Sequence, residues 1–316
     1  MVSGLSVVFF GTPEFAVPTL DAILASSHRV VGVVTQPDKP RGRGQKLTDA
    51  PVKARALSAG LPVFQPSTMK DAAFVEQLTR LGADIGVVAA YGKILTEAVL
   101  ATPRLGMINV HASLLPKYRG AAPVHRSVMA GDDVTGVTIM RVVKALDAGA
   151  MLATVERAIG PDDTSDQVEA DLARLGATLL VQTLDRLAQG PVVETPQDDA
   201  GATYAHRLSR EDGVVNWSLA ARDIHNQIRG LHPWPHAFSF IDGARLILHR
   251  SSWTPEPASA EPGTILVAHG EVLSVATGDG TVLITELQAE GKRPAHTREF
   301  LAGRRLAPGQ RFHAQP

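Results

Sequence analysis

Two polar side chains lie at the end of an apolar segment, in the stretch MINVHASLLPKYRGAAPVHRS at residues 107–127. Residues 107–110 are typical of a buried strand, and alternate side chains of a strand point to the same face, so we expect Asn109 and His111 to lie together. The carboxyl ends of strands in an open α/β sheet form the usual ligand crevice. An amide and an imidazole placed there can donate hydrogen bonds to an oxyanion.

A carboxylate would complete an acid–base site, and Asp147 in KALDAGAML is the candidate. It follows the apolar segment 137–142, and a positioned carboxylate can accept a proton. Each residue also has a plain structural interpretation, because Asn109 and Asp147 are common turn residues and His111 can be a half-buried histidine with satisfied hydrogen bonds. The pairing of Asn109 with His111 at one strand end favours a functional interpretation.

The elements that must position these residues follow an α/β pattern. Helix-like segments separate most of the continuous apolar runs, which lie at residues 5–10, 29–35, 85–90, 107–110 and 137–142. Runs that are apolar throughout indicate strands covered on both faces. Their alternation with helices indicates a parallel sheet with right-handed crossovers.

The last third of the chain has a different pattern. Residues 191–215 are rich in Pro, Gly, Asp and Glu, and residues 219–231 match one amphipathic helix. Short β-rich runs follow without helices between them, and Asp242-Gly243 marks a hairpin. This pattern predicts a small OB-like β-barrel. Since 316 residues suit about two domains, we expect boundaries at residues 1–190, a linker at 191–207, and a second domain at 208–316.

Composition and motifs exclude several classes of function. The chain has no cysteine, which removes disulfides and thiolate metal sites. The first strand ends in GTPEF rather than G-x-G-x-x-G, and there is no P-loop, so dinucleotide and ATP sites are not expected. His232 and His236 have the spacing of a zinc helix, but Pro233 and Pro235 prevent a helix between them, and we expect no metal.

The N-terminus, the apolar stretches and the net charge bear on the location of the protein in the cell and on its partners. The N-terminus has no basic region or cleavage site, and no apolar stretch approaches the ~20 residues of a membrane span. We therefore expect a cytoplasmic protein with no membrane partner. The formal net charge is −1, so any nucleic-acid binding must depend on locally concentrated basic residues.

The motif around His111 resembles the folate-dependent formyltransferases over about residues 5–190. It reads Asn109-x-His111-x-Ser113-Leu-Leu-Pro116-x-x-Arg119-Gly-Ala-Ala-Pro123, then Gly136-Val-Thr-Ile139 and Leu146-Asp147-x-Gly149. The resemblance implies a doubly wound, mostly parallel α/β sheet and a catalytic set of Asn109, His111 and Asp147. It also implies 10-formyltetrahydrofolate as the formyl donor, with residues 141–147 lining its site together with Ser113, Leu114, Leu115, Pro116, Ala89, Ala90, Tyr91 and Gly92.

One segment departs from the family pattern. Where the family resembles M-D-x-G-L-D-T-G, this chain has V-V-K-A-L-D-A-G at residues 142–149. The second aspartate is retained as Asp147, whereas the first aspartate, a glycine and the threonine are absent. The sequence therefore keeps the implied catalytic carboxylate but does not predict the conformation of its loop.

The implied reaction needs these residue types. A formyl group on a folate nitrogen is amide-like, and attack by an amine creates a tetrahedral centre that bears an oxyanion. Asn109 and His111 can donate hydrogen bonds to that oxygen. The attacking amine, with a reference pKa of roughly 8, must also lose a proton. Asp147 can accept it through a water or can hold His111 in a useful protonation state, and the sequence leaves both roles open.

Two basic segments bear on the acceptor of the formyl group. The segment PDKPRGRGQKL resembles an inserted loop of the methionyl-tRNA formyltransferases that contacts the acceptor arm, and it carries Lys39, Arg41, Arg43 and Lys46. The C-terminal tail carries a second basic group, with Lys292, Arg293, Arg304 and Arg305. Both groups suit phosphate contacts, although each can also be a solvated surface.

We therefore expect an enzyme that moves the formyl group to the free amino group of methionyl-initiator tRNA, for translation initiation. In this interpretation residues 1–190 are catalytic and residues 208–316 bind tRNA. A formyltransferase acting on a small amine, such as glycinamide ribonucleotide or an amino-sugar nucleotide, explains residues 107–149 but neither basic segment. A non-catalytic RNA-binding protein explains the basic segments but gives the Asn-His-Asp set no role. The oligomeric state does not follow from the sequence, with a monomer only favoured.

Overall fold

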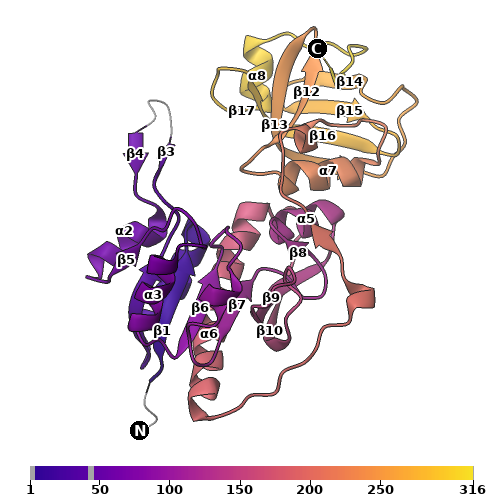
Figure 1. Cartoon of the computed structure of the whole chain (residues 1–316). Helices are drawn as coiled ribbons and strands as arrows, with labels where there is room; N and C mark the ends of the chain where they lie inside the picture. The colour runs from indigo at the N-terminus through magenta and orange to yellow at the C-terminus, as the bar shows by residue number, and fades with distance from the viewer. Residues whose placement is uncertain (1–3, 42–45, 316) are drawn as a thin grey trace. The chain divides into compact units, whose positions relative to one another are not determined.

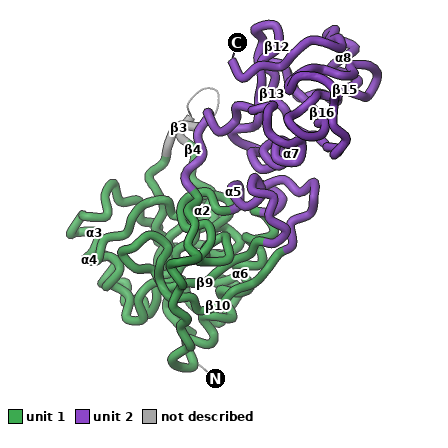
Figure 2. Tube along the Cα trace, turned by 90° about the vertical axis from the view of Figure 1, so that its right-hand side faces the viewer, with its two compact units in different colours: residues 1–123, 135–157, 169–205 green, residues 124–134, 158–168, 206–316 purple. Residues whose placement is uncertain are grey.

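The computed structural model describes residues 4–41 and 46–315, and the chain divides into two compact units (Figure 2). Unit 1 comprises residues 1–123, 135–157 and 169–205. Unit 2 comprises residues 206–316 together with two internal segments, 124–134 and 158–168. These two segments therefore belong with the C-terminal part of the chain, although each is flanked on both sides by residues of unit 1.

Unit 1 is built on a seven-stranded sheet of order β10-β9-β7-β6-β1-β2-β5 (Figure 1). The strands from β7 to β5 in this order run parallel, and β7 pairs antiparallel with β9. The predicted mostly parallel α/β sheet is confirmed. Its strands are β1 (Ser6–Gly11), β2 (Arg29–Val34), β5 (Val63–Phe64), β6 (Ile85–Ala89), β7 (Met107–His111), β9 (Val134–Arg141) and β10 (Met151–Ala158).

Helices cover both faces of this sheet, as a doubly wound fold requires. Phe74 and Val99 come from two helices on one face and share a buried cluster with Met107 of β7. The long helix α6 packs on the other face, because a Cβ at Gly176 would lie 2.8 Å from Cγ1 of Val110. The helices around the sheet are α1 (Val17–Leu24), α2 (Pro51–Ser58), α3 (Ala72–Arg80), α4 (Glu97–Leu100) and α6 (Ser165–Gln189), with a short 3-10 turn at Glu14–Ala16.

Two short strand pairs accompany the main sheet. Strands β3 (Lys39–Arg41) and β4 (Lys46–Thr48) pair antiparallel at the two ends of the basic loop. Strands β8 (Arg119–Gly120) and β11 (Tyr204–Ala205) pair in parallel. The second pair brings residues near the end of unit 1 beside the segment that follows β7.

Unit 2 has an antiparallel sheet of order β12-β13-β16-β15-β14, with β17 paired to β16. The predicted hairpin is confirmed, because Ile241 pairs with Ala244 across Asp242 and Gly243, whose φ angles of 51° and 72° are those of a two-residue hairpin turn. An OB-like closure of the sheet stays a prediction. Its strands are β12 (Ala237–Ile241), β13 (Ala244–Thr254), β14 (Ile265–His269), β15 (Val272–Ala276), β16 (Thr281–Ala289) and β17 (Ala295–His296).

Buried polar contacts join the internal segments of unit 2 to its C-terminal part. The predicted amphipathic helix is present as α7 (Ala221–Gly230), and Arg229 near its end is only 6% exposed. The Arg229 guanidinium donates to the carbonyls of Gly160 and Asp163, both at 3.1 Å. The Gly230 carbonyl accepts from Ser165 Oγ at 2.7 Å and from His125 Nδ1 at 2.8 Å. His125 lies on α5 (Pro123–Ala130), and α8 (Thr297–Gly303) completes the helices of this unit.

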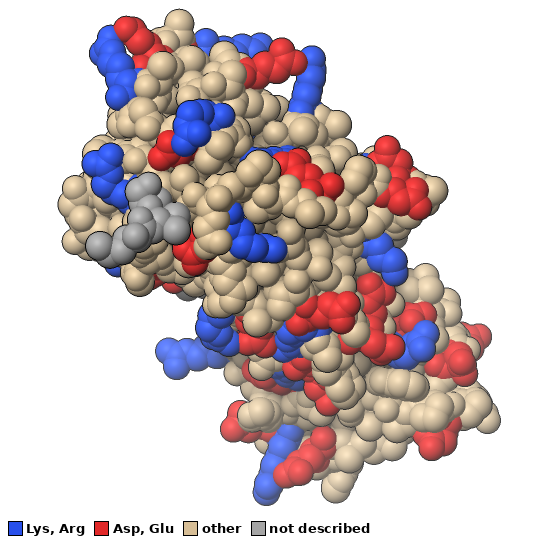
Figure 3. All heavy atoms as spheres, turned by 90° about the horizontal axis from the view of Figure 1, so that it is seen from below, with Lys and Arg blue, Asp and Glu red and all other residues tan. Residues whose placement is uncertain are grey.

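Charged side chains of both signs are mixed on the surface. Figure 3 shows Lys and Arg interspersed with Asp and Glu on the face in view, in keeping with the formal net charge of −1. Among the described helices, none combines the length and the apolar character that a bilayer span needs. Because the net charge is close to zero, any contact with nucleic acid must come from local basic groups.

Candidate active site

His111 ends strand β7, and its ring is 5% exposed. Its Nε2 lies 3.0 Å from the Tyr118 carbonyl oxygen, which can only accept, so Nε2 carries a proton and donates. Nδ1 faces Asp147, with 3.8 Å between Nδ1 and Oδ2, longer than a hydrogen bond. Nδ1 is therefore the ring nitrogen that remains for proton exchange.

Asp147 reaches His111 from the loop between β9 and β10, even though the sequence of that loop departs from the family pattern. Asp147 has a φ of 47°, an uncommon conformation for a residue with a side chain, and its Oδ2 accepts from the Gly120 N–H at 2.8 Å. The loop passes so close to β9 that a Cβ at Gly149 would lie 1.9 Å from the Arg141 carbonyl oxygen. Glycine is therefore required at position 149 for Asp147 to take this place.

Asn109 shares a face of β7 with His111, because side chains alternate along a strand. It is half-buried, and within the described part of the chain its carboxamide has no hydrogen-bond partner. Its register partner on β6 is Val88, so residues 89–92 follow directly beside it. The amide is thus free to donate to a ligand at the carboxyl end of β7.

The structure brings the three predicted catalytic residues together. Asn109 and His111 project from one strand end, and Asp147 approaches the ring of His111 from the next loop. The arrangement brings an amide, an imidazole and a carboxylate to the carboxyl end of β7, the groups that stabilisation of an oxyanion and proton transfer require. The catalytic roles of the three residues stay a prediction.

In the first segment predicted to hold folate, residues 113–116, buried and partly exposed side chains alternate. Ser113 is fully buried, and its hydroxyl donates to the Lys117 carbonyl at 2.7 Å. Leu115 is also buried, and its N–H donates to Thr138 Oγ1 at 3.1 Å. The neighbouring positions, Leu114 and Pro116, are partly exposed. A ligand would therefore meet the side chains of these last two residues.

In the second segment predicted to hold folate, residues 89–92, buried and exposed residues also alternate. Ala89 and Tyr91 are buried, whereas Ala90 and Gly92 are exposed and have φ angles of 45° and 77°. Burial raises the pKa of the Tyr91 hydroxyl to about 12, so the side chain stays neutral. The Tyr91 carbonyl accepts from Gln36 Nε2 at 2.7 Å. Only the exposed pair is available to line a ligand site.

The predicted tRNA-binding residues are only partly described. Arg43 lies outside the described residues, and Lys39, Arg41 and Lys46 belong to β3 and β4 with side chains outside the description as well. In unit 2, Lys292, Arg293 and Arg305 are exposed and Arg304 is partly exposed. None of these four takes part in an ion pair with another described residue, which leaves their charges available to an external anion.

Sequence reasoning missed a further set of residues that contact the candidate site. Gln197 donates to the carbonyls of Asp147 and Gly149, both at 2.8 Å, and Arg119 donates to Gln197 and Asp199. These contacts join positions 48 to 80 residues apart in the chain. Gln197 and Asp199 lie in a Pro- and Asp-rich stretch with no periodic pattern, so sequence alone places them only in a loop.

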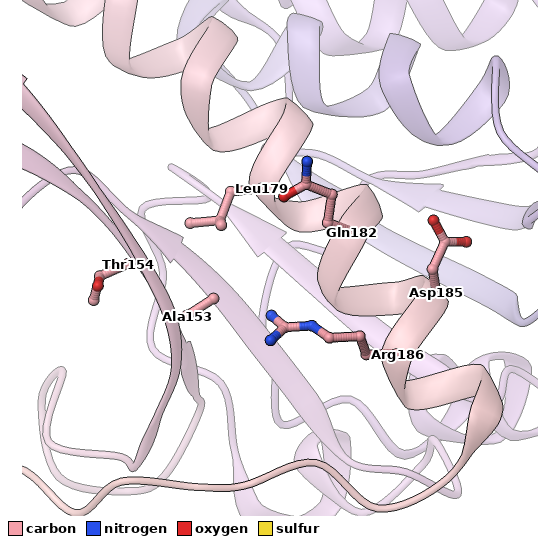
Figure 4. A pocket seen from close by; sticks show the side chains of 6 residues that line it. All are labelled: Ala153, Thr154, Leu179, Gln182, Asp185 and Arg186. Carbon is pink, nitrogen blue, oxygen red and sulfur yellow. The ribbon is translucent and has the colours of Figure 1, made fainter.

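A separate hollow of about 580 Å³ lies between β10 and α6 (Figure 4). Its lining residues are Ala153, Thr154, Leu179, Gln182, Asp185 and Arg186. None of them belongs to the cluster around His111. The hollow contributes nothing to that cluster, and the candidate site rests on the hydrogen bonds at the end of β7.

Comparisons with known proteins agree with this geometry. A family profile described as formyl transferase matches residues 5–184, and one described as formyl transferase, C-terminal domain, matches residues 207–305. A crystal structure of the N-formyltransferase from Helicobacter canadensis, in complex with folinic acid and dTDP-3-aminofucose, has a TM-score of 0.69. It is 18% identical and covers 90% of this chain and 99% of that chain, a likeness of fold.

Two bacterial proteins are similar over nearly the whole length. The methionyl-tRNA formyltransferase of Heliobacterium modesticaldum is 47% identical over 316 residues, which cover 98% of this chain and 100% of that protein. The methionyl-tRNA formyltransferase of Geobacter sulfurreducens is 45% identical over 311 residues, with 98% of each chain covered. Together with the two family profiles and the cluster at the end of β7, these similarities establish that the chain belongs to the methionyl-tRNA formyltransferase family.

Proposed function

We propose that this chain transfers the formyl group of 10-formyltetrahydrofolate to the free amino group of methionyl-initiator tRNA, for translation initiation. The observation that carries the proposal is the 47% identity to a methionyl-tRNA formyltransferase over 98% of this chain and 100% of that protein. The meeting of Asn109, His111 and Asp147 at one strand end supports it, because amine attack on a formyl group needs oxyanion donors and a proton acceptor.

In the proposed reaction the amine nitrogen attacks the formyl carbon. One C–N bond forms to the amine, and the bond from the same carbon to the folate nitrogen breaks. The amine loses a proton and the folate nitrogen gains one, so the reaction is balanced without any other reactant. The charge that develops on the formyl oxygen would be stabilised by the Asn109 amide, and losing one such donor costs ~100- to 1000-fold in rate.

His111 and Asp147 have complementary parts in this proposal. Nε2 of His111 is committed to the Tyr118 carbonyl, so Nδ1 is the ring nitrogen that would face the reacting groups. Asp147 Oδ2 lies 3.8 Å from Nδ1. The Asp147 side chain is 17% exposed, so a water beside it can carry the amine's proton to the carboxylate.

In this proposal the N-terminal and C-terminal parts of the chain have different functions. Residues 1–190 would bind the folate and carry out the transfer, and residues 208–316 would bind tRNA. In unit 2 the support is the exposed group of Lys292, Arg293, Arg304 and Arg305, which lacks ion-pair partners among the described residues. The basic loop with Lys39, Arg41, Arg43 and Lys46 is proposed to contact the acceptor end, where cations can neutralise phosphates.

The test uses the full-length protein with 10-formyltetrahydrofolate and three acceptors in parallel: charged initiator tRNA, glycinamide ribonucleotide and a dTDP-amino sugar. We expect formylmethionyl-tRNA from the first and no formylated product from the others. Transfer to a small amine but not to charged tRNA would support the alternative enzyme. Binding of the tRNA without any transfer, at every folate concentration, would support a non-catalytic RNA-binding protein.

A further inference from the structure

Gln197 occupies an unusual place in an otherwise exposed segment. Met151 and Thr195 form an isolated antiparallel bridge, with hydrogen bonds of 2.8 and 2.9 Å, which holds the segment against the start of β10. The flanking residues 193–196 and 198–200 are exposed, whereas Gln197 is partly buried. Its side chain therefore turns inward, toward the loop that carries Asp147.

The carboxamide of Gln197 uses all of its hydrogen-bonding capacity. Its Nε2 donates to the carbonyl oxygens of Asp147 and Gly149, both at 2.8 Å. Its Oε1 accepts from Nε and Nη2 of Arg119 at 3.0 and 2.8 Å. A primary amide has two N–H donors and one oxygen with two lone pairs, so this set of partners matches a carboxamide side chain.

The loop held by Gln197 needs such external contacts. Asp147 has a positive φ, and Ala148 stands between the two clamped carbonyls where the family pattern has a threonine. On the opposite side, Gly120 donates its N–H to the Asp147 carboxylate at 2.8 Å. Since Arg119 immediately precedes Gly120, the same short strand contacts both the side chain of Asp147 directly and its main chain through Gln197.

Arg119 is itself firmly placed. Its side chain is 5% exposed, and Nη2 donates to the Asp199 carboxylate at 2.7 Å, so the guanidinium charge has a partner besides the Gln197 amide. The carboxamide is therefore not needed to neutralise Arg119. What it adds is a rigid connection from Arg119 to the Asp147 loop.

We propose that Gln197 is a positioning residue, which fixes the Asp147 carboxylate opposite His111 Nδ1 by clamping the main chain on both sides of Ala148. This inference rests on the proposed formyl transfer, because it assigns Gln197 a role through Asp147. Displacement of a reacting group by about 1 Å can cost ~100-fold in rate, so a loosened loop should slow the transfer without preventing substrate binding.

The test compares Gln197→Glu with Gln197→Met in the full-length protein. Glutamate keeps the acceptor for Arg119 but has no donor for the two carbonyls, and methionine loses both functions. We expect both variants to lower kcat by about 10- to 100-fold with little change in the KM for the folate donor. We also expect the pH profile of kcat to change, because the contact between Asp147 and His111 is altered.

Gln227→Glu is the matched control. Gln227 Nε2 donates to the carbonyls of Asp212 and Val214 at 2.8 and 3.0 Å, so it forms a similar clamp in unit 2, remote in sequence from Asp147. We expect the control to lower the melting temperature and leave the pH profile of kcat unchanged. If the Gln197 variants behave like this control, Gln197 is a purely structural residue and the proposal is wrong.

A measurement without substrate separates this inference from the proposed function. The His111 ring can be titrated by NMR in the wild type and in Gln197→Met, which adds no charge, and we expect different titration curves. Identical curves would overturn the positioning role. A wild type that transfers no formyl group would overturn the proposed function instead, while the titration would still decide the role of Gln197.

Discussion

Each unit contains a histidine beside other titratable groups, and the two clusters differ in what their charges can do. In unit 1, His111 faces the carboxylate of Asp147. In unit 2, His236 faces two other histidines, with ring centroids 4.5 Å from His249 and 5.4 Å from His232. An acid opposite a base can pass a proton, whereas histidines packed together disfavour one another's charged forms.

The unit 2 cluster has the features of a structural group. Burial lowers the pKa of His236 to about 4, and the nearby His249, His232 and Arg245 act in the same direction. The outer histidines are tied by hydrogen bonds, His249 to Gln288 and His232 to Asp166. Within residues 4–41 and 46–315, no group of three or more His, Asp or Glu is placed to hold a metal ion. The number of histidines therefore does not mark the candidate site. In unit 1 the Asp147 carboxylate lies 3.8 Å from His111 Nδ1 without a direct hydrogen bond, whereas the carboxylate of the unit 2 cluster, Asp166, is already hydrogen-bonded to His232 at 2.9 Å.

The largest expected effect is that of Asp147→Asn, which tests the unit 1 cluster. Asparagine keeps the size of the side chain but removes the negative charge, so it cannot accept the amine's proton. We expect turnover to fall by at least ~100-fold, the contribution of positioned proton transfer. Turnover and folate affinity should be measured on one preparation.

The stability of the Asp147→Asn variant helps to distinguish a catalytic aspartate from one that only forms a turn. Asparagine tolerates the positive φ at this position, and its oxygen can still accept from Gly120, so we expect the fold and folate affinity to be retained. A folded variant with near-normal turnover would leave Asp147 as a turn residue. The cluster of unit 1 would then be no more reactive than that of unit 2.

A smaller effect is expected from the double variant Lys292→Ala/Arg293→Ala, close to the unit 2 cluster. Gln288 accepts from His249 and donates to the Lys292 carbonyl at 2.6 Å, so this basic turn adjoins the histidines. We expect a several-fold higher KM for charged tRNA, an unchanged kcat, and a salt dependence flatter by about two units of slope. Kinetics at several salt concentrations measure all three.

Arg298→Ala is the control for that experiment. Arg298 is also exposed in unit 2, but it lies 3.5 Å from Glu271 in an ion pair, so less of its charge is available to phosphate. We expect it to change the salt slope less than the double variant does. Equal slopes for the control and the double variant would remove the basic turn from the tRNA-binding surface.

The smallest expected effect is on the pH dependence of stability in His236→Asn. The folded-state pKa of about 4 lies below the ordinary value of 6.5, so the unfolded chain binds more protons between these values. The contribution of the neutral ring to stability is complete above pH 6.5 and is lost as the pH falls toward 4. Asparagine tolerates the positive φ and does not titrate, so the variant should lose less stability on acidification.

Thermal unfolding at about pH 7.5 and about pH 5 measures this slope in the wild type and the variant. His225, whose pKa burial also lowers, should leave a residual slope in both, and Asp166 beside His232 titrates below this window. We expect formyl transfer at neutral pH to be little affected. If His236→Asn left the pH dependence of stability unchanged but abolished formyl transfer, the unit 2 cluster would have a functional role and not a structural one.

The parts of the molecule that sequence predicts well are those with a local pattern. Strand β7 is continuous and apolar up to its polar end, so alternation alone put Asn109 and His111 on one face. The Asp242-Gly243 turn was readable because few residue pairs adopt two positive φ angles. Strand β10 was missed, since its residues alternate mainly between partly buried and exposed positions and form no long apolar run.

Contacts between distant segments had no such pattern. Gln197 is 50 residues from Asp147, and nothing in the intervening sequence predicts that its amide would meet that loop. The membership of residues 124–134 and 158–168 in unit 2 was equally hidden, because buried partners such as Arg229 lie on an ordinary amphipathic helix. The candidate reactive groups could therefore be predicted from the sequence, whereas the contacts that hold them are visible only in the fold.

The interleaving of the two units has a consequence for the gene and for synthesis. Unit 2 is not encoded by one continuous stretch of coding sequence, so a transfer of residues 206–316 alone to another protein would leave residues 124–134 and 158–168 behind. On the ribosome, His125 emerges 105 residues before its partner Gly230. At ~5–20 residues per second, the interval is roughly 5–20 seconds, and during it the segment that carries His125 lacks its hydrogen-bond partner in the C-terminal part of unit 2.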